Sequence, residues 1–254
     1  MSNYSVSELL GIFERLNAAG WQAILVGGQA VNIWCTRYAE SIPQLADYQP
    51  LVSRDLDFHG GIADAKLAMK LLNAGGKLNS GNDPSPNAAV IEVTMANGET
   101  LLIDILTSIY GVSTSELIRS AVKWTFNEYS HELNLRVIHP ILLLESKLAC
   151  YRSLPQIGRQ DAKHAILMTL VLRAWLLEQL TEPRQVFKGV ERIVSLMQTP
   201  DALSAYTKNI DLWAAIPLAE MHNTQGFQQF FSQRLNQLQD EVNDRRTRYL
   251  DALK

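Results

Sequence analysis

Ser53-Arg54-Asp55-Leu56-Asp57-Phe58 and, upstream of it, Val26-Gly27-Gly28-Gln29-Ala30 are the two stretches around which the rest of the chain is arranged. Asp55 and Asp57 are two residues apart in a short apolar segment that is typical of a β-strand. Because side chains alternate across a strand, both carboxylates are expected on one face. Neighbouring carboxylates repel each other unless a cation lies between them, and Mg²⁺ prefers oxygen ligands. The spacing therefore predicts a metal site.

The glycine pair has the sequence of a tight turn. Leu25-Val26-Gly27-Gly28 is typical of a strand that ends in a turn, with a helix beginning near Gln29. Glycine allows the backbone to approach a ligand closely, and the N-terminus of a helix offers amide groups to an anion. A phosphate cradle together with a metal-binding carboxylate pair predicts nucleotide chemistry.

A third carboxylate has two candidates, Glu92 and Asp104. Segments 89–95 and 100–106 have the composition of strands, and Asn97-Gly98 between them predicts a two-residue hairpin loop. That register would place Glu92 and Asp104 on opposite faces of the sheet. Asp104 lies in an almost wholly apolar strand, where a buried carboxylate is costly without a partner or a metal. We therefore predict that Asp104 completes the site and that Glu92 lies at an exposed edge.

The composition indicates a globular protein, since 47% of the 254 residues are hydrophobic and 19% are charged. No apolar run is long enough to span a bilayer, and the N-terminus lacks a signal pattern, so we expect no membrane partner. Cys35 and Cys150 are the only cysteines and make no disulfide framework. A reducing cytoplasm is therefore the expected compartment.

Strand and helix patterns alternate up to Pro140, and helical patterns follow it. The expected strands are near 21–26, 54–58, 89–95, 100–106, 121–126 and 133–138. The expected helices are near 5–18, 29–37, 63–73, 113–119, 140–153, 160–180, 183–198 and 224–253, with loops at 38–52 and 75–87. This order predicts an α+β fold, in which a small mixed sheet with helices on one side is followed by an all-helical C-terminal domain. The predicted domains are 1–138 and 139–254.

The glycine turn, the Asp-x-Asp strand and the later carboxylate together resemble the nucleotidyltransferase fold of the DNA polymerase β superfamily. Within it, the two quoted stretches are most similar to AbiEii/MenT-type toxin nucleotidyltransferases, and the resemblance covers about residues 20–165. It implies that three residues hold magnesium and are catalytic: Asp55, Asp57 and Asp104. It also implies that four residues of the two stretches contact the nucleotide: Gly27, Gly28, Gln29 and Ser53.

The implied reaction is an in-line attack on the α-phosphate of an NTP, with pyrophosphate leaving. Two metal ions can stabilise both the attacking and the leaving oxygen in such a reaction. In this scheme Asp55 and Asp57 hold both ions. Asp104 holds the catalytic ion and accepts the proton of the attacking hydroxyl.

A second cluster, in residues 147–152 and 159–163, is partly similar to the Lys-x-x-Ala-x-x-x-Arg and Lys-Asp-x-x-Asp segments of AbiEii-type proteins. The resemblance implies that Lys147 contacts the triphosphate and that Asp161 orients a base or an acceptor. His164 stands where the second Asp of that pattern is expected. The second basic role stays open among Arg152, Arg159 and Lys163. An exposed helix face is the alternative reading of the basic residues.

Charge is unevenly distributed along the chain, although the net charge is only −3. Residues 147–192 hold 8 basic and 4 acidic residues. A positive face beside a metal site would receive a triphosphate or an RNA backbone, whereas the alternative is a solvated helix face.

We therefore expect a metal-dependent nucleotidyltransferase that transfers NMP from an NTP to RNA, such as a tRNA 3′ end, or to a protein. The resemblance implies that it acts as the toxin of a toxin–antitoxin pair, with an antitoxin protein as partner. One alternative is a small-molecule nucleotidyltransferase, such as one that modifies an antibiotic. Another is a catalytically silent nucleotidyltransferase-like binding module, which an intact carboxylate triad disfavours.

Overall fold

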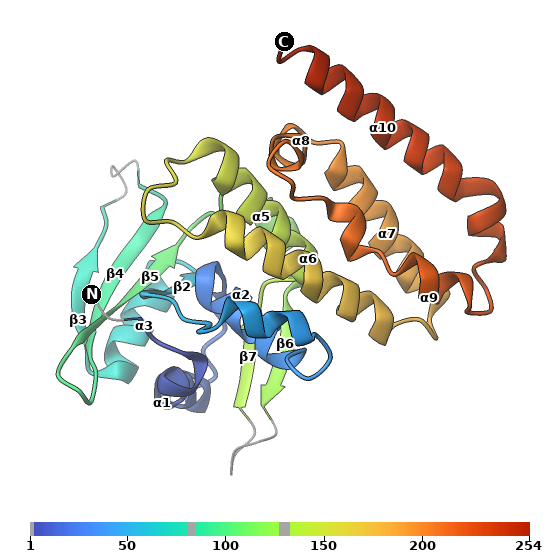
Figure 1. Cartoon of the computed structure of the whole chain (residues 1–254). Helices are drawn as coiled ribbons and strands as arrows, with labels where there is room; N and C mark the ends of the chain where they lie inside the picture. The colour runs from blue at the N-terminus through green and yellow to red at the C-terminus, as the bar shows by residue number, and fades with distance from the viewer. Residues whose placement is uncertain (1–2, 81–84, 127–132) are drawn as a thin grey trace. The chain divides into compact units, whose positions relative to one another are not determined.

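The computed structural model describes residues 3–80, 85–126 and 133–254. The chain forms two compact units (Figure 1). The first consists of Met1–Arg37 and Gln44–Leu143, and the second of Tyr38–Pro43 and Leu144–Lys254. The predicted division into domains 1–138 and 139–254 stays a prediction, because compactness alone does not test which segments fold independently.

In the described part of the first unit, seven strands form one mixed sheet in the order β3-β4-β5-β2-β1-β7-β6. The strands are β1 Ile24–Leu25, β2 Asp55–His59, β3 Gly75–Leu78, β4 Asn87–Thr94, β5 Thr100–Leu106, β6 Val122–Phe126 and β7 Leu133–Val137. Strand β2 is central, parallel to β5 on one side and antiparallel to β1 on the other. The predicted α+β fold with a mixed sheet is confirmed.

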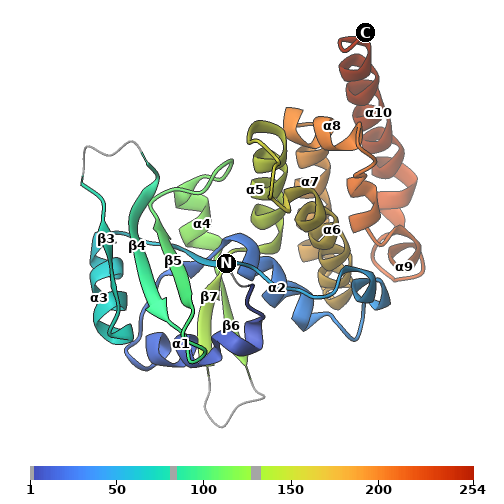
Figure 2. The same ribbon diagram turned by 60° about the vertical axis from the view of Figure 1, so that its left-hand side comes forward.

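One face of the β2–β5 region is packed with apolar side chains. Leu56 and Phe58 of β2, with Ile103 and Ile105 of β5, are buried on the packed face. The ring of Phe58 meets Trp21 edge to face at 4.6 Å. The helical elements of the first half are α1 Val6–Ala18, α2 Gly27–Arg37, η1 Pro43–Tyr48, α3 Ile62–Leu72 and α4 Thr114–Ser120. Figure 2 shows α3 alongside β3 and β4.

The β4–β5 hairpin differs from the prediction, because its loop has three residues. The amide of Met95 donates to the carbonyl of Glu99 at 2.8 Å, which leaves Ala96-Asn97-Gly98 as the loop. Gly98 has a φ of +81°, the left-handed conformation that ends this type of loop. The extra residue shifts the register by one, so that Asp104 faces Val90. The prediction that Glu92 and Asp104 lie on opposite faces is therefore wrong.

Segment 75–87 also differs from the predicted loop. Gly75–Leu78 forms β3, which pairs antiparallel with β4 at the edge of the sheet. Its Gly-Gly start hid the strand from sequence patterns, since glycine is depleted in strands. Residues 81–84 of the predicted loop lie outside the described residues.

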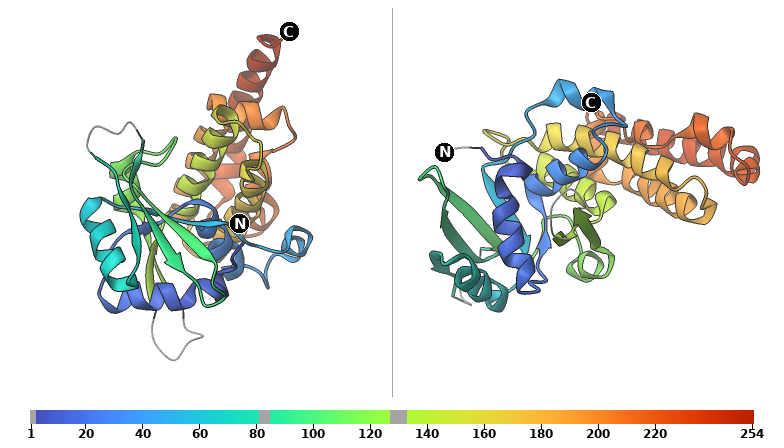
Figure 3. Two further views of the ribbon diagram at one scale, coloured as in Figure 1. Left: turned by 90° about the vertical axis from the view of Figure 1, so that its left-hand side faces the viewer. Right: turned by 90° about the horizontal axis from the view of Figure 1, so that it is seen from below.

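The second unit is helical, as predicted, and no strand occurs between Leu144 and Lys254 (Figure 3). Helix α5 runs from Pro140 to Ser153 and so begins just before the unit does. The other elements are α6 Asp161–Glu178, α7 Pro183–Met197, α8 Pro200–Tyr206, η2 Leu212–Ala215, α9 Leu218–His222, the π-helical turn η3 Phe230–Arg234 and α10 Leu235–Asp251. The predicted single helix 224–253 is therefore shorter and begins with a π turn.

Among the described residues, no helix combines the length and apolar character that crossing a membrane requires.

Candidate metal centre

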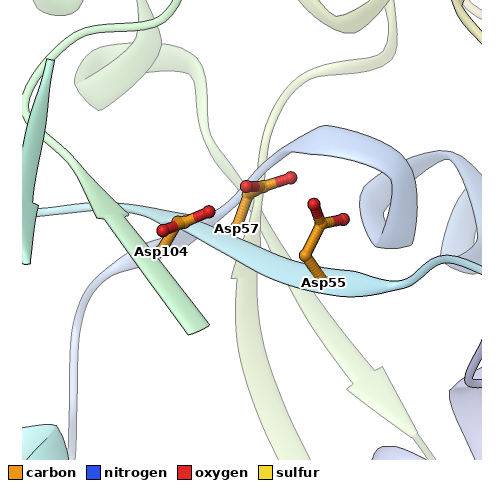
Figure 4. A group of neighbouring side chains, drawn as sticks. All are labelled: Asp55, Asp57 and Asp104. Atoms are coloured by element: carbon orange, nitrogen blue, oxygen red, sulfur yellow. The ribbon is translucent and has the colours of Figure 1, made fainter. Parts of the chain in front are cut away.

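Three half-buried carboxylates meet on the face of the sheet opposite to that of Leu56 and Phe58. Asp55 and Asp57 lie on β2 and point to the same side, and Asp104 on the parallel strand β5 is the register partner of Asp57. One oxygen from each carboxylate lies within 4.8 Å of the other two. Figure 4 shows all three side chains on the same side of their strands. Strand alternation and parallel register thus bring together the three residues that the sequence predicted as metal ligands.

Glu92 lies outside this cluster, but for a different reason from the one predicted. In the observed register it pairs with Leu102 and shares a face with Asp104, because Val90 faces Asp104 and alternate residues share a face. Glu92 is exposed. Glu92 is therefore separated from the triad by its position on that face, and not by lying on the opposite face.

The surroundings of Asp104 shift the pKa of its carboxyl group. Burial, followed by the negative charge of Asp55, raises the pKa of Asp104. The amide nitrogen Nδ2 of Asn87 donates to Asp104 Oδ1 at 3.2 Å. The sequence analysis missed Asn87, because its contact depends on the hairpin register and on an irregularity of β4 between Asn87 and Ala89.

Gly27 lies directly against Asp57. It has a φ of +68°, and a Cβ atom at this position would overlap Asp57 Oδ2 and lie 2.7 Å from Asp57 Cγ. The amide of the preceding residue, Val26, donates to the carbonyl of Asp57 at 2.9 Å. Gly27 therefore has two roles that only glycine meets, a left-handed backbone and room for a carboxylate.

Helix α2 begins at Gly27, two residues earlier than predicted. The first amide groups of a helix have no partner within it and are available to an anion. The predicted nucleotide contacts Gly27 and Gly28 thus lie in the first turn of a helix that starts beside Asp57. The side chain of Gln29 points elsewhere, since it is fully buried and its Nε2 donates to the carbonyl of Tyr4 at 2.7 Å.

Ser53, also predicted as a nucleotide contact, lies next to the triad. Its hydroxyl donates to Asp55 Oδ1 at 3.1 Å. Its backbone pairs with Tyr4 in an isolated antiparallel bridge. The direct partner of the Ser53 hydroxyl in the structure is thus a predicted metal ligand.

Lys147 and Asp161 belong to the second unit, where they pair with each other. Asp161 is 2% exposed and Lys147 is 8% exposed, with 3.5 Å between Lys147 Nζ and Asp161 Oδ1. Arg159 Nε donates to the other carboxylate oxygen at 2.6 Å. His164 is buried beside them, and its Nδ1 has no hydrogen-bond partner in the part of the chain that the structure describes. Lys147, Arg159, Asp161 and His164 of the second predicted motif therefore lie together, and Lys147 is buried and not on an exposed helix face.

The positive stretch 147–192 is partly neutralised within the second unit. Three of its arginines pair with carboxylates from outside the stretch, namely Arg152 with Asp201 at 3.2 Å, Arg173 with Glu220 at 2.6 Å and Arg192 with Glu145 at 2.9 Å. Local composition therefore overstates the positive charge that this stretch offers to a polyanion.

Comparisons with known proteins yield a similarity to a solved structure. No family model matches it, and no curated protein matches it. Among solved structures, it is similar to an antigenic nucleotidyltransferase-like protein from Paracoccidioides brasiliensis. That similarity has a TM-score of 0.43 and 14% identity, over 75% of this chain and 95% of the other.

The fold and the site define an α+β protein with a three-carboxylate cluster able to hold a divalent cation. The donor set fits such an ion, because hard divalent cations take carboxylate oxygens as ligands. Burial, and then the negative charge of Asp55, raise the pKa of Asp104, and a bound cation would offset both effects.

Proposed function

We propose that this chain is a metal-dependent nucleotidyltransferase, which transfers NMP from an NTP to an acceptor hydroxyl and releases pyrophosphate. The observation that carries the proposal is the convergence of Asp55, Asp57 and Asp104 within 4.8 Å, with the first turn of α2 against Asp57. Carboxylates repel a phosphate, whereas a helix N-terminus attracts one. A site that contains both suits a nucleotide bound through a cation.

Each group has a definite task in this reaction. The three carboxylates would hold the cation, with Mg²⁺ as the ion we propose, and a bound ion of this kind neutralises charge on phosphate oxygens. The amides at the start of α2 would bind a phosphate. A bond forms between the acceptor oxygen and the α-phosphorus, and the bond to the oxygen that leaves with pyrophosphate breaks. Asp104 would accept the proton of the hydroxyl.

The acceptor we propose is RNA, with a tRNA 3′ end as the first substrate to test and protein as the second. The sequence resemblance to toxin nucleotidyltransferases supports this choice, together with a role as toxin alongside an antitoxin protein. The same resemblance supports contact between Lys147 and the triphosphate and an orienting role for Asp161. For Gln29, whose side chain is bonded to Tyr4, a nucleotide contact would come from the backbone amide.

The test is incubation of the full chain with each of the four α-labelled NTPs and total RNA, with and without Mg²⁺, followed by the same assay with cell lysate. We expect label in RNA, release of pyrophosphate, and loss of both in Asp57→Asn. That substitution removes a ligand charge and conserves side-chain volume. Equal labelling by wild type and Asp57→Asn would contradict the proposal, as would an absence of labelling of RNA and protein with every NTP.

A further inference from the structure

Hydrogen bonds join three segments close to Asp55, namely those that contain Tyr4, Gln29 and Ser53. Tyr4 and Ser53 exchange two backbone hydrogen bonds, from Tyr4 N to Ser53 O at 2.8 Å and from Ser53 N to Tyr4 O at 3.1 Å. The Ser53 hydroxyl then donates to Asp55 Oδ1 at 3.1 Å. The N-terminal segment thus fixes the backbone from which the Ser53 hydroxyl reaches the carboxylate.

The third segment is the start of helix α2. Gln29 is fully buried, and its Nε2 donates to the same Tyr4 carbonyl at 2.7 Å. Its Oε1 accepts from Asn32 Nδ2 at 3.0 Å, so both ends of the amide are satisfied. Because a buried amide that loses a partner is costly, Gln29 holds the Tyr4 carbonyl in place. Helix α2, whose first residue lies against Asp57, is therefore also linked to Asp55 through the Tyr4 backbone and Ser53.

We propose that this buried chain of hydrogen bonds, from Gln29 through the Tyr4 backbone to Ser53, positions Asp55 for cation binding. Ser53 and Gln29 are then positioning residues, and neither touches the ion. The inference rests on the proposed function, since it assumes that the three carboxylates hold a cation. This positioning role would account for the polar side chains at two buried positions, Gln29 and Ser53.

The test measures Mn²⁺ affinity of the full-length, nucleotide-free protein from the paramagnetic resonance signal of free Mn²⁺. Removing a hydrogen-bond partner of a metal ligand costs about tenfold in affinity or more, so we expect at least that loss in Ser53→Ala. Ser53→Thr keeps the hydroxyl and should bind like wild type. Gln29→Met should also weaken binding, and the double variant Ser53→Ala/Gln29→Met should bind no more weakly than Ser53→Ala, because both changes break one chain.

Two controls separate positioning from general stability. Ile33→Ala removes a fully buried side chain from the same helix and no hydrogen bond, so it should lower the melting temperature without changing Mn²⁺ affinity. Ser120→Ala removes a hydroxyl bond to the carbonyl of Glu116 in α4 and should change neither. If Gln29→Met does not fold, the Ser53 variants decide alone.

The outcomes are distinguishable. Wild-type affinity in Ser53→Ala, with binding lost in Asp57→Asn, would overturn the positioning role and leave the metal site intact. Weakened binding in Ile33→Ala to the same extent as in Ser53→Ala would also overturn it, because stability would then explain both. Wild-type affinity in Asp57→Asn would overturn the metal site itself, and the inference with it.

Discussion

Gly27 lies so close to the carboxylate of Asp57 that a residue with a Cβ atom does not fit at this position. We expect Gly27→Ala to abolish Mn²⁺ binding, because the added methyl group overlaps the position of Asp57 Oδ2. The left-handed backbone adds about 1–2 kcal/mol of destabilisation. Calorimetric titration of Mn²⁺ and thermal unfolding measure the two effects separately.

The chain contains a matched control for this prediction. Gly20 has the same φ of +68°, and a Cβ atom there would have nothing within 4 Å. Gly20→Ala should therefore show a similar loss of stability and unchanged Mn²⁺ affinity. Equal affinities in the two variants would show that Asp57 can move aside.

The two acidic residues of the hairpin should differ sharply in their effect. Asp104→Ala should eliminate nucleotidyl transfer and weaken Mn²⁺ binding, because it removes one of the three clustered ligands. Glu92→Ala should retain a rate close to wild type, because Glu92 is exposed and lies outside the cluster. Both variants are compared in one transfer assay and one metal titration. An active Asp104→Ala beside an inactive Glu92→Ala would reverse the assignment of the third ligand.

At the scale of elements, local patterns predicted most strands and helices, and the three candidate metal ligands lie on two of the predicted strands. Asp55 and Asp57 could be predicted because alternation along one strand is independent of its neighbours. Asp104 was predicted from its apolar surroundings, although the argument from opposite faces failed with the loop length. A two-residue and a three-residue loop share the Asn-Gly signal, and one residue reverses the parity of the pairing.

Long-range contacts could not be predicted from those patterns. The roles of Ser53 and Gln29 depend on Tyr4, whose bridge to Ser53 joins residues far apart in the sequence. Asn87 reaches Asp104 only through the observed register of β4. A single sequence carries no signal for such pairs, because neither propensity nor periodicity specifies which segments meet.

The ion pair between helices α5 and α6 leads to a prediction about stability. Asp161→Leu should cost about 3–5 kcal/mol, because it leaves the nearly buried Lys147 without its carboxylate. The double variant Lys147→Met/Asp161→Leu should recover part of that loss, since no unpaired lysine charge remains at the site. Urea unfolding of wild type, Lys147→Met, Asp161→Leu and the double variant measures the coupling. If Asp161→Leu is as stable as wild type, the pair is not a structural feature of these helices.

At the scale of the whole molecule, acid should destabilise the chain through His164. Burial, and then the positive charge of Lys147, lower the pKa of His164 from 6.5 to about 3. The unfolded chain binds a proton near pH 6.5 and the folded chain does not, so the unfolding free energy falls as the pH drops from 6.5 toward 3. The slope from this residue approaches about 1.4 kcal/mol per pH unit.

His164→Gln isolates this contribution, because the other titrating groups are common to both proteins. Its unfolding free energy, measured in urea at pH 7, 5.5 and 4.5, should fall less steeply than that of wild type. Parallel slopes would show that the imidazole binds its proton equally well in the folded and unfolded states.

The central place of β2 has a kinetic consequence. Its backbone is hydrogen-bonded to β5 on one side and to β1 on the other, whereas its carboxylates are only half-buried. An ion could therefore enter and leave without any strand separating from its neighbours. Treatment with a chelator should leave the far-ultraviolet circular dichroism and the slow amide exchange of residues 55–59 unchanged, and added Mn²⁺ should rebind fully. Unfolding on chelation would instead mean that the ion holds the sheet together, as in domains that are built around their metal.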